Sequence, residues 1–247
     1  GVIRLSELED ALRPDTILVS VMHVNNETGA VMPLREIAAV LRRRKSRALF
    51  HSDGVQAFMK LPLNVERLGV DLYSVSGHKV HAPKGVGALY IRRGVRIPPL
   101  ICGGGQENGL RSGTEGVPLI AAFGAALKSA PADAARTVAA LRTRLTEGLA
   151  QLPGARVNFP DSLPCVVSLS LPGRRAEVVM RILEGRGVYV STGSACAKGR
   201  RSYVLEAAGL PPDVIDGSLR ASLSYTNTPE DIDALLEGLR DAAARLS

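Results

Sequence analysis

One apolar segment of this chain runs directly into a lysine that has a hydroxyl and an imidazole beside it. The stretch reads Ser74-Val75-Ser76-Gly77-His78-Lys79. A lysine amine held in a confined site loses basicity and becomes nucleophilic at neutral pH, as Schiff-base chemistry requires. The side chains of Ser76 and His78 are suitable ligands for a phosphate. A single lysine is more often a solvated surface charge, so this interpretation depends on the surrounding motifs.

A carboxylate follows the preceding predicted strand, which spans Ala48 to His51. Asp53 comes just after this strand, and Gln56 lies one short turn further on. A carboxylate in that place can keep a pyridine nitrogen protonated, which makes the ring an electron sink. The alternative is that Asp53 only caps the next helix, and the residues alone leave both interpretations open.

An earlier strand ends in a loop that contains Asn25, Asn26 and Gly29. Its side-chain amides could bind a phenolic oxygen or a substrate carboxylate. They could equally well form a turn, which is the commoner use of adjacent asparagines near a glycine.

A cysteine near the end of the chain has the surroundings of a reactive thiol. Cys196 lies among small residues and glycines, in a stretch predicted to be an exposed loop. Lys198, Arg200 and Arg201 follow it and favour the thiolate. By contrast, Cys165 in an apolar run fits a buried structural role, and we expect the same of Cys102.

Short β-branched runs alternate with amphipathic stretches, which predicts an α/β fold of βα units with a largely parallel sheet. In such sheets, ligands bind at the carboxyl ends of the strands. Predicted strands cover residues 17–22, 48–51, 71–75, 87–92, 155–159, 166–171, 188–191 and 219–224. Predicted helices cover residues 34–45, 117–130, 134–152, 176–187 and 229–246. Pro131 and Asp133 mark a break, so we place one domain at residues 1–130 and a second, smaller α/β domain at 131–247.

Composition narrows the functional classes. The chain has 247 residues, and 45% of them are hydrophobic, which is enough for a buried core. Its apolar runs are too short to cross a membrane, and three scattered cysteines suggest neither disulfides nor a zinc site but a reducing, cytoplasmic setting. The net charge is +7, but the basic clusters are short and aromatics make up only 4%. We therefore expect no direct nucleic-acid binding.

Several of these motifs, taken in order, resemble the active-site segments of the cysteine desulfurases, which are fold-type I pyridoxal-phosphate enzymes of the class-V aminotransferase group. The segments are Met22 to Gly29, His51 to Gln56, Ser76 to Lys79, Gly103 to Glu107, Arg111 to Thr114 and Thr192 to Cys196. The resemblance extends over nearly the whole chain. Ser52 and Gly54 depart from the residues more usual in their segment.

The resemblance implies a role for each of these residues. Lys79 would hold pyridoxal 5'-phosphate in a Schiff base, Asp53 would pair with the pyridine nitrogen, and Gln56 would contact the ring hydroxyl oxygen. Ser76 and His78 would bind the phosphate, together with Thr114 from the neighbouring subunit of a homodimer. Asn26 and Arg220 would hold the substrate carboxylate, which suits the planar fork of an arginine. Cys196 would accept sulfur as a persulfide.

The implied activity is conversion of L-cysteine to L-alanine, with the sulfur passing to an acceptor protein for iron-sulfur cluster assembly or for thiolation of cofactors or tRNA. The family's N-terminal portion, including part of the phosphate site and a ring-stacking histidine, is not in this sequence. A separate chain that supplies this portion is one hypothesis, and truncation is another. Two rival functions remain: a selenocysteine lyase or other fold-type I aminotransferase, and an inactive fragment that acts as a binding module.

Overall fold

The computed structural model describes residues 1–192 and 201–246, and the chain forms two compact units. Unit 1 contains residues 1–2, 24–31 and 131–247, and unit 2 contains residues 3–23 and 32–130. The short stretch 24–31 therefore groups with the second half of the chain. The division into domains at 1–130 and 131–247 stays a prediction.

The sheet of unit 2 has four strands in the order β1-β2-β3-β4. Their bounds are Leu18–Ser20 (β1), Leu49–Asp53 (β2), Leu72–Ser76 (β3) and Gly87–Ile91 (β4). The first three strands are parallel, and β4 pairs antiparallel with β3. Because parallel strands end at one edge, the carboxyl ends of β2 and β3 lie together, with Asp53 opposite Ser74.

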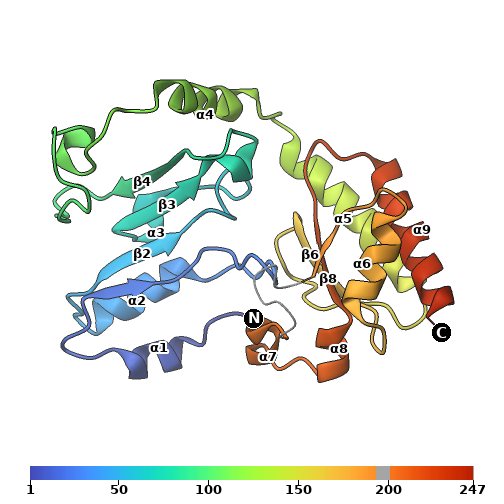
Figure 1. Ribbon diagram of the computed structural model, residues 1–247. Helices are drawn as coiled ribbons and strands as arrows, with labels where there is room; N and C mark the ends of the chain where they lie inside the picture. Colours follow the sequence, from blue (N-terminus) through green and yellow to red (C-terminus); the bar gives the residue numbers. More distant parts are fainter. Residues whose placement is uncertain (193–200, 247) are drawn as a thin grey trace. The chain divides into compact units, whose positions relative to one another are not determined.

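Helix α2 (Leu34–Arg43) covers this sheet with an amphipathic face (Figure 1). Its buried residues recur at helical spacing and include Leu34, Ile37 and Leu41. Its last turn contains two arginines, whose positive charges interact favourably with the negative end of the helix dipole. The remaining helices of the unit are α1 (Leu5–Ala11), α3 (Val65–Leu68), η1 (Gly77–Val80), η2 (Glu107–Gly109) and α4 (Val117–Ser129).

The sheet of unit 1 differs from the predicted parallel arrangement. Its order is β5-β6-β8-β7, and each neighbouring pair is antiparallel. The strands are Arg156–Val157 (β5), Val166–Ser170 (β6), Ser191–Thr192 (β7) and Ser218–Ser222 (β8). Helix α6 (Ala176–Glu184) connects β6 to β7, and these two strands run in the same direction, as a βα pattern predicts. Strand β8 inserts between them in the opposite direction, which the pattern does not reveal.

Three helices pack on one face of this second sheet: α5 (Ala134–Ala150), α6 and α9 (Pro229–Arg245) (Figure 1). Alternate residues of β6, Val167 and Leu169, enter their apolar core. The intervening residues, Ser168 and Ser170, face the other way and accept hydrogen bonds from the buried amide of Asn158 at 3.0 and 2.8 Å. The polar face of β6 is therefore buried and satisfied.

Arg142 of α5 is a charged residue, but it is buried among the leucines that this helix contributes to the apolar core. Its guanidinium donates to four backbone carbonyl oxygens of one loop. The acceptors are Phe159 at 3.2 Å, Pro160 at 2.7 Å, Leu163 at 3.4 Å and Val166 at 3.3 Å. Burial lowers the pKa of Arg142 from its ordinary value. One side chain thus holds the loop that leads into β6.

The predicted element types agree with the observed ones, but several bounds shift. The predicted strand at 17–22 shortens to β1, and the predicted strand at 188–191 becomes β7, because Gly187 (φ 76°) turns the chain after α6. The short helices α1, α3, α7 (Tyr203–Ala207) and α8 (Pro212–Asp216) lack a full apolar period and were not predicted. Among the described residues, no helix is long and apolar enough to cross a membrane.

Candidate active site

Lys79 lies on η1, the single 3₁₀ turn that follows β3. Its neighbours Gly77 and Val80 are buried and fix the turn, whereas Lys79 is half-buried and His78 is exposed. The Oγ atom of Ser76 lies 2.7 Å from Nδ1 of His78. The turn therefore presents a paired hydroxyl and imidazole next to an amine, at the carboxyl end of the strand.

Asp53 is the last residue of β2 and is half-buried. Its Oδ1 atom accepts a hydrogen bond from the backbone N–H of Val55 at 2.8 Å. This local contact fits the alternative interpretation, in which Asp53 only caps the segment that follows the strand. The carboxylate can still accept further hydrogen bonds. Gln56 is also half-buried, and its Oε1 accepts from Nζ of Lys60 at 3.4 Å.

A buried pair behind Asp53 was not predicted from the sequence. The hydroxyl of Tyr73 lies 2.8 Å from Nδ1 of His23, and both side chains are buried. Burial lowers the pKa of His23, while burial and the charge of Asp53 raise the pKa of Tyr73. Both groups are therefore neutral near pH 7, and the imidazole tautomer decides which of them donates the hydrogen bond. Tyr73 lies within a strand pattern, so nothing in the sequence distinguishes it from a core residue.

The ring of Tyr73 explains why glycine occupies position 54. A Cβ atom built on Gly54 would overlap the ring carbons and the hydroxyl of Tyr73. This ring is fully buried and hydrogen-bonded, so it has little room to move. Gly54 is therefore the residue that allows a tyrosine beside Asp53.

We expect Gly54→Ala to destabilise the protein by about 2 kcal/mol or more, because it overpacks a closed site. The midpoint of thermal unfolding measures the change. The double variant Gly54→Ala with Tyr73→Leu should regain part of the loss, since it removes the overlapping ring. Equal stability of Gly54→Ala and the unsubstituted protein would contradict the assigned contact.

Asn26 and Arg220 lie together in unit 1. Arg220 is on β8, and its Nη1 donates to the backbone oxygen of Asn26 at 3.0 Å. Its Nε atom is buried and has no hydrogen-bond partner in the part of the chain that the structure describes. The side chain of Asn25 instead makes the turn, because its Oδ1 accepts from the backbone N–H groups of Glu27 and Thr28.

The other predicted residues lie apart from these two groups. Thr114 is exposed, in the loop between η2 and α4. Cys196 lies outside the described residues. Cys165 is buried, as expected, but Cys102 is exposed, so the structural role expected for it is wrong. Cys102 lies in a glycine-rich loop beyond the strands, where no core forms around it.

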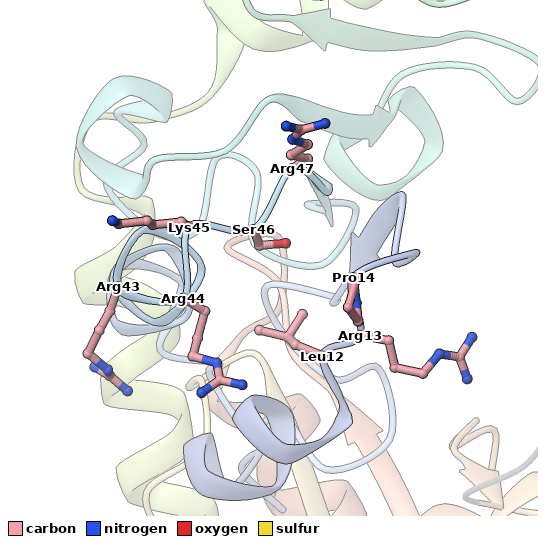
Figure 2. A pocket seen from close by; sticks show the side chains of 8 residues that line it. All are labelled: Leu12, Arg13, Pro14, Arg43, Arg44, Lys45, Ser46 and Arg47. Carbon is pink, nitrogen blue, oxygen red and sulfur yellow. The ribbon is translucent and has the colours of Figure 1, made fainter.

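A separate hollow in unit 2 carries a cluster of basic side chains at the amino ends of β1 and β2 (Figure 2). It is lined by Leu12, Arg13, Pro14, Arg43, Arg44, Lys45, Ser46 and Arg47. Its cationic side chains point in different directions, and three of them pair with Glu9 or Asp15. They do not converge on one anion.

The structure thus gathers two groups of predicted residues. Asp53, Ser76, His78 and Lys79 lie at one edge of the sheet in unit 2, and Asn26 and Arg220 are in contact in unit 1.

The family model described as aminotransferase class-V matches residues 1–235. The chain belongs to this family.

Known relatives of this class-V chain include named cysteine desulfurases. Cysteine desulfurase IscS of Methanosarcina thermophila is 42% identical over 100% of the chain and 62% of its own length. Cysteine desulfurase 2 of Trichormus variabilis is 45% identical over 100% of the chain and 63% of its own length. The chain therefore spans less than two thirds of the length of these relatives.

Solved structures show the same fold. A NifS-like protein superposes with a TM-score of 0.90 at 40% identity, covering 99% of this chain and 65% of that one. SspA in complex with cysteine superposes with a TM-score of 0.76 at 35% identity, covering 92% and 64%. The fold is thus that of the fold-type I pyridoxal-phosphate enzymes.

Class-V aminotransferases and cysteine desulfurases depend on pyridoxal phosphate. The residues of unit 2 fit this group. The edge of the sheet offers an amine for the aldehyde, a half-buried carboxylate for the pyridine nitrogen, and a hydroxyl and imidazole 2.7 Å apart for the phosphate.

Proposed function

We propose that the protein containing this chain is a cysteine desulfurase, which converts L-cysteine to L-alanine and transfers the sulfur to Cys196. The register of β2 against β3 carries the proposal, because it brings Asp53 to the edge from which Lys79 and the Ser76–His78 pair project. The identity to named cysteine desulfurases along the whole chain supports it.

Each residue has a chemical task in this proposal. Lys79 attaches the cofactor and, once free, moves the proton between the α-carbon and solvent. Asp53 keeps the pyridine nitrogen protonated, and the bound cofactor then supplies an electron sink. Ser76 and His78 hold the phosphate. The neutral Tyr73–His23 pair adds no charge beside Asp53.

Arg220 and Asn26 orient the substrate carboxylate. The buried, unpaired Nε of Arg220 supports this role, since it leaves donor capacity for an anion. The Cys196 thiolate then attacks the substrate sulfur. The carbon–sulfur bond of cysteine breaks, a sulfur–sulfur bond forms on Cys196, and the remaining carbon skeleton takes up a proton to give alanine.

We also propose a cytoplasmic homodimer in which Thr114 reaches the phosphate of the neighbouring subunit. The exposed thiol of Cys102 supports a reducing compartment, and the exposed position of Thr114 leaves it accessible to a partner. The persulfide would pass to an acceptor protein for iron-sulfur cluster assembly or thiolation. A further chain or segment would complete the phosphate site.

The test is the yield of alanine and sulfide from L-cysteine by the full-length protein and its Cys196→Ala variant. We expect product formation on cysteine to fall to background in the variant, because the thiol assigned as the sulfur acceptor is absent. Cys102→Ala is a matched control that removes an exposed thiol and should retain activity. Unchanged turnover of cysteine by Cys196→Ala would favour a lyase or aminotransferase and overturn the proposal.

A further inference from the structure

The main chain at Asp53 is hydrogen-bonded to both neighbouring strand segments of unit 2. The backbone N–H of His23 donates to the backbone oxygen of Asp53 at 2.8 Å, which continues the pairing of β1 with β2 beyond Ser20. On the other side, the backbone N–H of Gly54 donates to the backbone oxygen of Ser74 at 2.8 Å. The backbone that carries the carboxylate is therefore fixed from two directions.

The side chains of His23 and Tyr73 meet on one face of the sheet, although β2 separates the segments from which they come. Nδ1 of His23 lies 2.8 Å from the hydroxyl of Tyr73, and the two rings meet edge to face with their centroids 5.9 Å apart. A Cβ atom at Gly54 would overlap the ring and the hydroxyl of Tyr73. The contact across β2 thus depends on the absence of a side chain at position 54.

Asp53 carries its carboxylate on the opposite face from this pair. Successive side chains of a strand alternate between the two faces, and the residues on either side of Asp53 are Ser52 and Gly54. Ser52 is paired in register with Tyr73 and is fully buried, whereas Asp53 is half-buried. Burial and the charge of Asp53 both raise the pKa of Tyr73, so the carboxylate is near enough to act on this hydroxyl.

We propose that His23 and Tyr73 are positioning residues for Asp53. Their contact beneath Gly54 fixes the direction in which the Asp53 carboxylate meets the pyridine nitrogen of the cofactor. Both residues act through Asp53 rather than on the cofactor itself. This inference rests on the proposed function and deepens it.

The physical reason is that the contacts form a closed set. His23 donates its backbone N–H to Asp53 and is tied by its side chain to Tyr73, and the ring of Tyr73 packs against Gly54, the residue after Asp53. Without the tie, the imidazole and the ring can each shift. A functional group is held in its productive geometry by such supporting contacts, and small displacements are costly.

The experiment uses the full-length protein and two variants of the pair. Tyr73→Phe removes the hydroxyl and keeps the ring. The double variant His23→Leu with Tyr73→Phe replaces both polar partners, so that no buried polar group is left unpaired and the loss of stability stays small. This double variant separates the positioning role from a general weakening of the fold.

Ser52→Ala is the matched control. The Oγ atom of Ser52 is buried and has no hydrogen-bond partner among the residues that the structure describes. The variant therefore removes a buried hydroxyl one residue away from Asp53, without breaking the contact between His23 and Tyr73.

Two quantities are measured on each protein, at temperatures equally far below its unfolding midpoint. The first is the dissociation constant of pyridoxal phosphate for the cofactor-free protein, by equilibrium dialysis. The second is the nitrogen-15 NMR signal of bound cofactor labelled at the pyridine nitrogen, which reports whether this nitrogen is protonated. Neither measurement depends on turnover of substrate.

We expect Tyr73→Phe and the double variant to weaken cofactor binding about threefold to tenfold, the size of effect that one hydrogen bond produces. In both variants the nitrogen signal should move toward that of the unprotonated ring, because the carboxylate no longer faces it in a fixed direction. Ser52→Ala should bind the cofactor within about twofold of the unsubstituted protein and keep its nitrogen signal.

The two proposals fail in different ways. If the unsubstituted protein binds no pyridoxal phosphate, or binds it with an unprotonated pyridine nitrogen, the proposed function is wrong and the inference falls with it. If the unsubstituted protein binds the cofactor with a protonated nitrogen, and the double variant matches Ser52→Ala in both measurements, only the positioning role of His23 and Tyr73 is wrong.

Discussion

Replacing Lys79 by alanine should abolish covalent attachment of pyridoxal phosphate to the full-length protein. The η1 turn that follows β3 presents this amine next to the Ser76–His78 pair, and alanine offers no nitrogen for a Schiff base. Borohydride reduction followed by mass spectrometry measures the attachment. The unsubstituted protein should retain a reduced cofactor on the peptide that contains Lys79, and the variant should retain none.

Lys84→Ala is the matched control for this experiment. Lys84 is exposed and lies five residues after Lys79, outside the η1 turn. Its loss removes the same charge but should leave the reduced adduct in place. An adduct that persists in Lys79→Ala, or that forms at Lys84 in the unsubstituted protein, would contradict the assignment.

Replacing Arg142 by alanine should cause the largest loss of stability among the variants considered, about 3 kcal/mol or more. The variant loses four hydrogen bonds from a charged donor and leaves the buried carbonyl oxygens of Leu163 and Val166 with fewer donors. It also removes the buried stem of the side chain. The free energy of unfolding in denaturant measures the effect.

Arg144→Ala provides the comparison within the same helix. Arg144 is exposed and pairs with Asp233, also at the surface. Exposed ion pairs contribute little to stability, so this variant should unfold close to the unsubstituted protein. A similar loss in both variants would show that the carbonyl contacts of Arg142 are not what stabilises the loop.

The sequence predicted the parts of the fold that depend on local pattern. Residues 34–45 show a helical apolar period, and α2 forms there with that face buried. Asp53 and Ser76 each come directly after a short predicted strand, and both lie at the ends of observed strands. Such features depend on residues close together in the chain, so a single sequence contains the information needed to predict them.

Contacts between distant segments could not be predicted in this way. Arg142 shares the helical spacing of the buried Leu145 and Leu149, but the sequence does not show that the loop at residues 159–166 supplies its acceptors. The Glu27–Ser202 and His23–Tyr73 contacts likewise join separate segments. The direction of β8 is a further example, since it depends on which strands become neighbours.

The close approach of Tyr73 to Gly54 also restricts how this site can diverge over evolutionary time. A lineage that starts from the present pair must first exchange the aromatic ring for a smaller side chain before position 54 can gain even one methyl group. If position 54 gained the methyl group first, the intermediate protein would carry it against the tyrosine ring and would fold poorly. The two positions should therefore vary together among descendants, and ancestral reconstructions should never place a bulky residue at both.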